Sequence, residues 1–170
     1  MEAAIVGVVG ALLGGLLVGF LTHWTSTTQA KRQMRWQQVR LAQEKLEKIA
    51  EYLDHIQNHY RKLVGDIVLR NETGQPMKNL NERIPISSLK ILIEFYAPEL
   101  LNDWRQLETV RDSFGEMLAQ SILNASPTTS DRQELNSKAI AEQGRVAAVC
   151  ESMGSKAALS AQKLVSEQML

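Results

Sequence analysis

The spacing of apolar residues predicts a long amphipathic helix over residues 25–70. From residue 39 to residue 67, apolar side chains recur at alternating intervals of three and four, the spacing of a heptad repeat on one helix face. The positions of this heptad seam are Val39, Ala42, Leu46, Ile49, Leu53, Ile56, Tyr60, Leu63 and Ile67. Ala50, Tyr52 and Val64 widen the face. A wide apolar face favours a helical bundle over a two-stranded coiled coil.

Further helices are predicted after a loop. Residues 71–86 contain one glycine, two prolines and three asparagines, a composition typical of a loop. Apolar residues at helical spacing then predict a bundle domain over 87–170, with helices at about 87–97, 98–124 and 130–168. We expect Ser87 or Ser88 to cap the first of these helices and Pro98 to end it. Ser130 and Gln133 are expected to form a capping box at the start of the last.

The N-terminal segment predicts a transmembrane helix. Residues 3–21 carry no charge and contain five of the ten glycines. A helix of this length rises about 28 Å, close to the roughly 30 Å hydrocarbon core of a bilayer. A signal peptide normally starts with basic residues, whereas Glu2 precedes this segment. We therefore expect residues 1–24 to be a retained anchor, with a buried core helix or an interfacial helix as the alternatives.

The flanking residues predict how this anchor is oriented. No acidic residue occurs between Glu2 and Glu44, and four basic residues follow the apolar segment: Lys31, Arg32, Arg35 and Arg40. The positive-inside rule then places the N-terminus outside and the rest of the chain in the cytoplasm. Trp24 lies where aromatic side chains meet the membrane surface. The basic residues are also candidates for contact with anionic lipid.

Small residues in the same segment predict association between membrane helices. Glycine and alanine recur every fourth position, and a second glycine pair lies beside them. The positions are Ala3, Gly7, Ala11, Gly15 and Gly19, with Gly10 and Gly14 as the second pair. Such a stripe lets two helices approach closely within the bilayer, which favours a homo-oligomer. The alternative is that glycine and alanine are simply common in membrane helices.

Charge and composition exclude some classes of function. Lys plus Arg and Asp plus Glu both number 19, so the net charge is zero. Nucleic-acid binders usually have a basic excess, so we expect no nucleic-acid partner. The single cysteine, Cys150, excludes a disulfide within the chain. Its apolar neighbours in the sequence predict a small buried residue rather than a reactive thiol.

Candidate chemistry is sparse, and we expect neither an enzyme nor a cofactor. His55 and His59 are four residues apart, a spacing at which one helix face can chelate a metal, and Glu51 lies one turn earlier. The alternative is an ordinary solvated helix face, because both histidines flank the heptad seam. The segment EFYAPEL, residues 94–100, combines carboxylates and aromatic residues at a helix break. It can be a docking site or a packed kink.

The chain resembles small membrane-anchored helical proteins of bacteria and prophages. The features that carry the resemblance are the glycine-rich N-terminal segment, the helix QVRLAQEKLEKIAEYLDHI and the segment EFYAPEL. The resemblance implies the bacterial inner membrane and no particular activity.

Three functions are compatible with these patterns. The first is a single-pass, self-associating membrane protein whose cytoplasmic helices scaffold or dock a protein partner. The second is an oligomerising, membrane-perturbing effector of the holin or anti-phage toxin type. Against it, residues 3–21 offer no polar side chain to line a water-filled pore. The third is an enzyme built around Glu51, His55 and His59.

Overall fold

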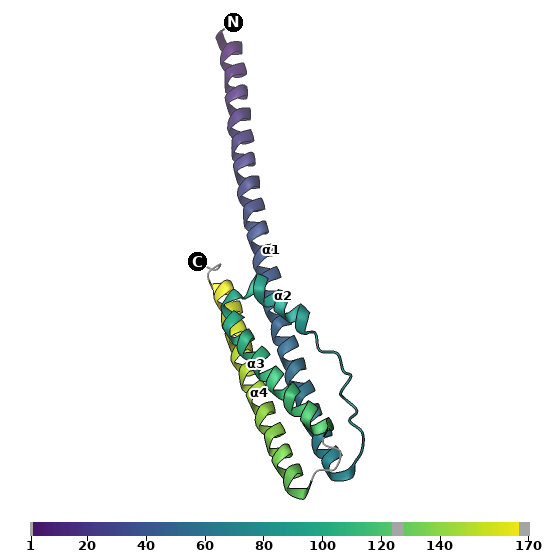
Figure 1. Cartoon of the computed structure of the whole chain (residues 1–170). Helices are drawn as coiled ribbons and strands as arrows, with labels where there is room; N and C mark the ends of the chain where they lie inside the picture. The colour runs from purple at the N-terminus through teal and green to yellow at the C-terminus, as the bar shows by residue number, and fades with distance from the viewer. Residues whose placement is uncertain (1, 124–127, 167–170) are drawn as a thin grey trace. The chain divides into compact units, whose positions relative to one another are not determined.

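The protein is all-helical, as the sequence predicts. The computed structural model describes residues 2–123 and 128–166, with side chains from residue 23 onward within these ranges. Over these residues the helices, shown in Figure 1, are α1 (Glu2–Thr73), α2 (Ile86–Tyr96), the 3-10 helix η1 (Pro98–Leu100), α3 (Leu101–Leu123) and α4 (Thr129–Ser166). None of the described residues forms a strand.

The chain divides into two compact units, residues 1–41 and residues 42–170. Helix α1 contributes to both units. In the first unit, all four basic residues of the predicted flank are exposed, and so is Trp24. Hydroxyl groups of this stretch bond back to the helix, as where Thr28 Oγ1 donates to the Trp24 carbonyl over 2.8 Å. Val39 is half-buried.

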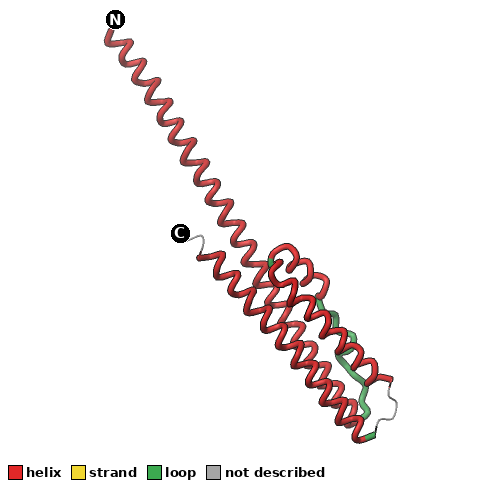
Figure 2. The backbone as a smooth tube through the Cα atoms, turned by 60° about the vertical axis from the view of Figure 1, so that its left-hand side comes forward, coloured by secondary structure: helices red, strands yellow, loops and turns green. Residues whose placement is uncertain are grey.

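The second unit is built around three long helical segments that lie side by side. They are residues 42–73 of α1, α3 and α4 (Figures 1 and 2). Seven of the nine seam positions are buried in its core: Leu46, Ile49, Leu53, Ile56, Tyr60, Leu63 and Ile67. The Tyr60 ring meets the Phe114 ring of α3 edge-on, with the ring centroids 4.8 Å apart. The heptad seam of α1 therefore packs within its own bundle.

Polar contacts at the two ends of this bundle show in which direction its helices run. At one end, Lys156 Nζ of α4 lies 2.8 Å from both carboxylate oxygens of Asp103 on α3. At the other end, Asn71 Nδ2 of α1 donates to Asn136 Oδ1 of α4 over 2.6 Å. Arg70 Nη2 donates to the Ile122 carbonyl over 3.2 Å. These contacts show that α3 and α4 run antiparallel.

The break at Pro98 is confirmed, but the predicted serine cap of α2 is wrong. Helix α2 starts at Ile86, and no side chain caps its N-terminus. At its other end, Ala97 leaves the helical region at φ −145° and ψ 56°, and Pro98 opens η1. Proline disfavours a helical conformation in the residue before it, which accounts for this break. Ala97 itself is fully buried, so the kink is packed against the core.

Helix α4 starts earlier than the predicted box at Ser130 and Gln133. Thr128 N–H donates to Asp131 Oδ2 over 2.9 Å, and Asp131 N–H donates back to Thr128 Oγ1 over 3.2 Å. This reciprocal pair is a capping box two residues upstream of the predicted one. The hydrogen bonds from Thr128 lower the pKa of Asp131, since they favour its charged form.

The predicted membrane anchor falls largely outside the described side chains. Over the part of the chain that the structure describes, no helix is long and apolar enough to cross a membrane. The seven small residues of the predicted association stripe lie outside the range of described side chains: Ala3, Gly7, Gly10, Ala11, Gly14, Gly15 and Gly19. The anchor and its stripe therefore stay predictions.

Candidate functional site

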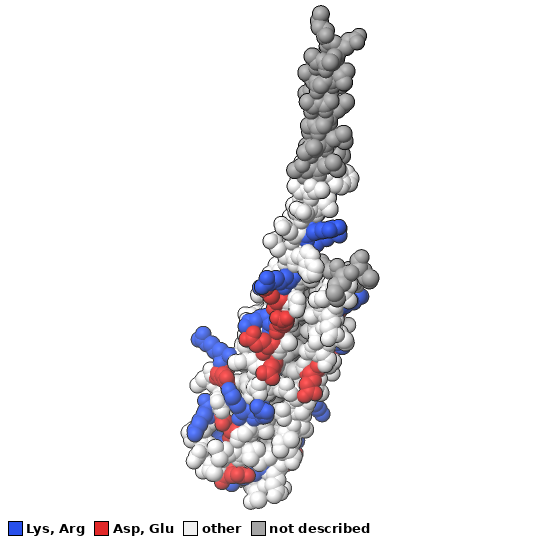
Figure 3. Space-filling model, turned by 180° about the vertical axis from the view of Figure 1, so that it is seen from behind, with Lys and Arg blue, Asp and Glu red and all other residues white. Residues whose placement is uncertain are grey.

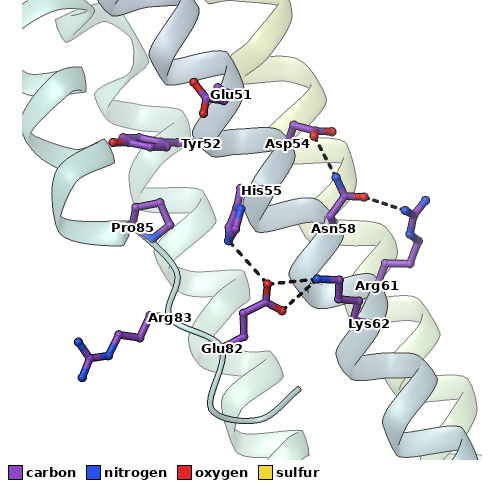
Figure 4. Close-up of a pocket in the computed structure, with 10 residues that line it drawn as sticks. All are labelled: Glu51, Tyr52, Asp54, His55, Asn58, Arg61, Lys62, Glu82, Arg83 and Pro85. Carbon is purple, nitrogen blue, oxygen red and sulfur yellow. Dashed lines mark hydrogen bonds and ion pairs between the residues drawn. The ribbon is translucent and has the colours of Figure 1, made fainter. Parts of the chain in front are cut away.

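The strongest cluster of polar side chains joins α1 to the loop of residues 74–85. Glu82 of the loop accepts hydrogen bonds from Lys62 Nζ over 3.1 and 3.2 Å, one at each carboxylate oxygen. His59 Nδ1 lies 3.3 Å from Glu82 Oε2, and His55 Nε2 lies 3.9 Å from Glu82 Oε1. Figure 4 shows His55 and Lys62 directed from α1 toward this carboxylate. One loop carboxylate thus meets three side chains of a single helix.

The helical repeat explains this convergence. His55, His59 and Lys62 are spaced four and three residues apart, so they lie on one face of α1. His59 is nearly buried, with its side chain 5% exposed, whereas the His55 side chain is 46% exposed. The expectation that both histidines lie on a solvated face is therefore wrong for His59. Glu82 of the loop lies against its ring, and spacing within one helix does not reveal that contact.

A second carboxylate holds the same loop. Asp66 Oδ2 on α1 accepts the backbone N–H groups of Lys78 and Asn79 over 2.8 and 2.7 Å. The Asn79 side-chain amide also donates to this carboxylate over 3.1 Å. The loop is consequently attached to α1 at two successive places, through Asp66 and through Glu82. Figure 2 shows it running beside the helices toward α2.

The predicted metal candidates are not brought together. Glu51 lies 2.6 Å from Lys48 Nζ in an ion pair on the surface of α1. Glu82, which spacing along the helix does not identify, is the carboxylate that reaches His55 and His59. Within residues 23–123 and 128–166, no group of three or more His, Cys, Asp or Glu side chains is placed to hold a metal ion.

Electrostatics favour a structural role for Glu82. The ammonium of Lys62, and after it His59, lowers the pKa of Glu82, so the carboxylate is ionised at neutral pH. An ionised carboxylate only accepts hydrogen bonds, so a hydrogen bond with His59 requires the proton on Nδ1. An acceptor fixed in this way holds the loop, and it is a poor source of protons for catalysis.

Cys150 occupies the core of the bundle. Its residue surface is 3% exposed, and burial raises the pKa of the thiol to about 12. A thiol with so high a pKa carries almost no thiolate at neutral pH, and the thiolate is the reactive form. The expectation of a small buried residue is confirmed.

The segment EFYAPEL divides between core and surface. Ala97 and Leu100 are buried, whereas the Phe95 residue surface is 75% exposed and Tyr96 is also exposed. On the same face of α2, Ile91 is 53% exposed. The packed kink is confirmed, and the docking site stays a prediction.

Two cavities lie beside these features. One, of about 560 Å³, is lined by His55, Lys62 and Glu82, with Tyr52 and Pro85 at one side (Figure 4). The other, of about 500 Å³, lies between α1 and α2 and is lined by Tyr52, Ile91 and Leu92. On the face shown in Figure 3, acidic and basic side chains are interspersed over the second unit.

Comparisons with protein-family models, with curated proteins and with solved structures found no match for this chain. The all-helical bundle is thus described by its own geometry, and its resemblance to prophage membrane proteins stays a prediction.

Proposed function

We propose that this protein is a single-pass, self-associating membrane protein of the bacterial inner membrane whose cytoplasmic helical bundle docks a protein partner. The observation that carries the proposal is the difference between the two parts of α1. This one helix begins with the uncharged segment 3–21 and ends with the buried seam that builds the bundle core.

The charges and aromatic residues after the apolar segment support the orientation. Lys31, Arg32, Arg35 and Arg40 are exposed, and so are Trp24 and Trp36. Cationic and indole side chains favour the membrane surface. There their charged or polar ends meet the lipid headgroups, and their apolar parts meet the hydrocarbon. Membrane lipid is accordingly the first partner in the proposal.

The docking role is supported by the exposed apolar face of α2. Ile91 and Phe95 of this helix expose apolar surface to water. Contact with another protein would remove that surface from water. Burial of such side chains is a common source of binding free energy, and aromatic residues are enriched among those that contribute most. The proposed role needs no catalytic group.

The experiment is a measurement of the oligomeric state of the full chain in nanodiscs or detergent by light scattering. Gly15→Leu places a bulky side chain on the small-residue stripe, so we expect it to dissociate the oligomer. Val9→Leu, on the opposite face of the same helix, is the matched control and should leave the mass unchanged.

Each other outcome has a definite meaning. An unchanged mass in Gly15→Leu contradicts association through the stripe. A soluble chain that does not partition with membranes contradicts the anchor. Leakage of a dye from vesicles, abolished by Gly15→Leu, favours the membrane-perturbing effector over the docking protein.

A further inference from the structure

A groove follows α1 in the second unit. The two cavities share Tyr52, and together they extend along α1 from Glu44 to Lys62. At the rise of an α-helix, these 18 steps span about 27 Å. The opposite wall is formed by the end of loop 74–85 and by α2. Figure 4 shows the Tyr52 ring projecting from α1 toward α2, above Pro85.

Part of the lining of the groove is apolar. Tyr52, Ile91, Leu92 and Pro85 line it, and Tyr52 is only partly buried. Phe95 follows Ile91 by four residues, so it extends the same face of α2 beyond the groove. A line of exposed apolar side chains beside a concave surface is typical of a peptide-binding groove.

The charges of the groove favour an acidic ligand. Five Lys and Arg side chains line it, against four carboxylates. Of the carboxylates, Glu82 is paired with Lys62 and Glu51 with Lys48. A third, Asp54, accepts a hydrogen bond from the Asn58 amide over 2.9 Å, and the fourth is Glu44.

Two of the cations that line the groove remain available for a ligand. Among the described residues, neither Lys45 nor Arg83 has an ion-pair partner. Figure 4 shows the Arg83 guanidinium extending outward from the loop, at the rim. Lys45 of α1 lines the same cavity as Ile91. A segment lying in the groove can therefore pair acidic side chains with Lys45 and Arg83 and bring apolar side chains to the apolar lining.

We infer that this groove binds an acidic, amphipathic peptide segment of a partner protein. The inference deepens the proposed docking function and rests on it. A segment of four to five helical turns has the length of the groove, since each turn rises about 5.4 Å.

The experiment selects ligands without assuming a partner. A displayed library of random 16-residue peptides is panned against the full chain in nanodiscs, with empty nanodiscs as the background. We expect the enriched peptides to be acidic, with apolar residues at helical spacing. Replacing the acidic residues of the best peptide by lysine should weaken its binding at least about tenfold.

Variants of the chain then locate the binding site. Phe95→Ser and Arg83→Glu should each weaken binding of the best peptide about tenfold or more, as measured by fluorescence anisotropy. Leu159→Ser and Arg105→Glu are matched controls on exposed positions of α4 and α3, and they should leave binding unchanged. All four positions are exposed, and circular dichroism checks that each variant remains folded.

Three outcomes overturn the inference. One is the absence of any peptide enriched over empty nanodiscs. Another is binding that lacks an acidic preference or that is weakened equally by the control variants. The third is a lower oligomer mass in Phe95→Ser, which assigns this face to a second copy of the chain.

The Gly15→Leu variant separates this inference from the proposed function. If its mass is unchanged while peptide binding follows the groove variants, self-association through the stripe is wrong and the groove stands. If the Gly15→Leu oligomer dissociates while Phe95→Ser and Arg83→Glu leave peptide binding unchanged, self-association through the stripe stands and peptide binding in the groove is wrong.

Discussion

Glu82 and His59 are 23 residues apart in the chain, yet Glu82 Oε2 lies 3.3 Å from His59 Nδ1. The contact brings a loop carboxylate against a histidine that is otherwise surrounded by the bundle. The His59 ring also meets the Tyr60 ring edge-on, with centroids 5.7 Å apart. A polar side chain at the border of the core thus obtains a charged partner from outside its own helix, as buried polar groups require.

Replacing Glu82 by glutamine should loosen one end of the loop only. Glu82→Gln removes the charge that attracts Lys62, so we expect backbone amides of residues 80–84 to exchange hydrogen several-fold faster. The amides of Lys78 and Asn79 should stay protected, because Asp66 accepts both of them. Hydrogen exchange followed by mass spectrometry measures both regions in one sample. Glu116→Gln, at an exposed position of α3, is the control. Faster exchange across the whole loop contradicts two separate attachments.

The contacts of Glu82 with Lys62 and His59 predict that the stability of the fold depends on pH. Lys62 and His59 lower the pKa of Glu82 in the folded protein, so its carboxylate stabilises the fold above its unfolded pKa. This contribution is lost as the pH falls through the lower, folded pKa. Thermal unfolding of the wild type and of Glu82→Gln should therefore differ at pH 7, and the difference should vanish toward about pH 3. A difference that persists in acid contradicts an ionic origin.

Two phenylalanines provide a matched test of the core. Phe114 is 1% exposed and packs against Tyr60, whereas Phe95 is 75% exposed. Phe114→Ala leaves a cavity among the three long helices, so the free energy of unfolding should fall by about 3–5 kcal/mol. Phe95→Ala should change it by less than about 0.5 kcal/mol. Denaturant titration followed by circular dichroism measures both values. Similar losses for the two variants contradict the described packing.

The fold was predictable from local patterns where side chains meet along one helix. The seam from Leu46 to Ile67 is buried because the three-and-four spacing describes the helix face itself. On α3, Trp104, Leu107 and Phe114 follow one another at helical spacing, and all three are buried. Pro98 ends α2 for a steric reason that acts on its immediate neighbour. These features depend on residues close in sequence.

The site was less predictable, because it joins residues far apart in sequence. Nothing in the spacing of α1 indicates that Glu82 replaces Glu51 beside His55 and His59. Glu82 belongs to a loop that Asp66 also holds, through the backbone N–H groups of Lys78 and Asn79. The exposure of Phe95 also depends on which face α2 turns to the core, where Leu89 and Ile93 are buried.

The start of α4 can be located by two neighbouring substitutions. Thr128→Ala removes the side-chain oxygen that accepts the Asp131 N–H, so the free energy of unfolding should fall by about 1 kcal/mol. Ser130→Ala should have little effect, because Ser130 lies inside the helix and is exposed. Denaturant titration compares the two. A larger loss for Ser130→Ala contradicts the cap at Thr128 and favours the box with Gln133.

Cys150 allows opening of the bundle to be measured directly. Burial raises the pKa of its thiol to about 12, so both thiolate formation and access are suppressed in the folded protein. Labelling with a maleimide at pH 7 should therefore be at least about tenfold slower than for a surface thiol. The reference is a chain carrying Cys150→Ser and Ala148→Cys, which moves the single cysteine to an exposed position of the same helix. Denaturant should make the two chains equally reactive. Equal labelling rates without denaturant contradict the burial of Cys150 in the core of the bundle.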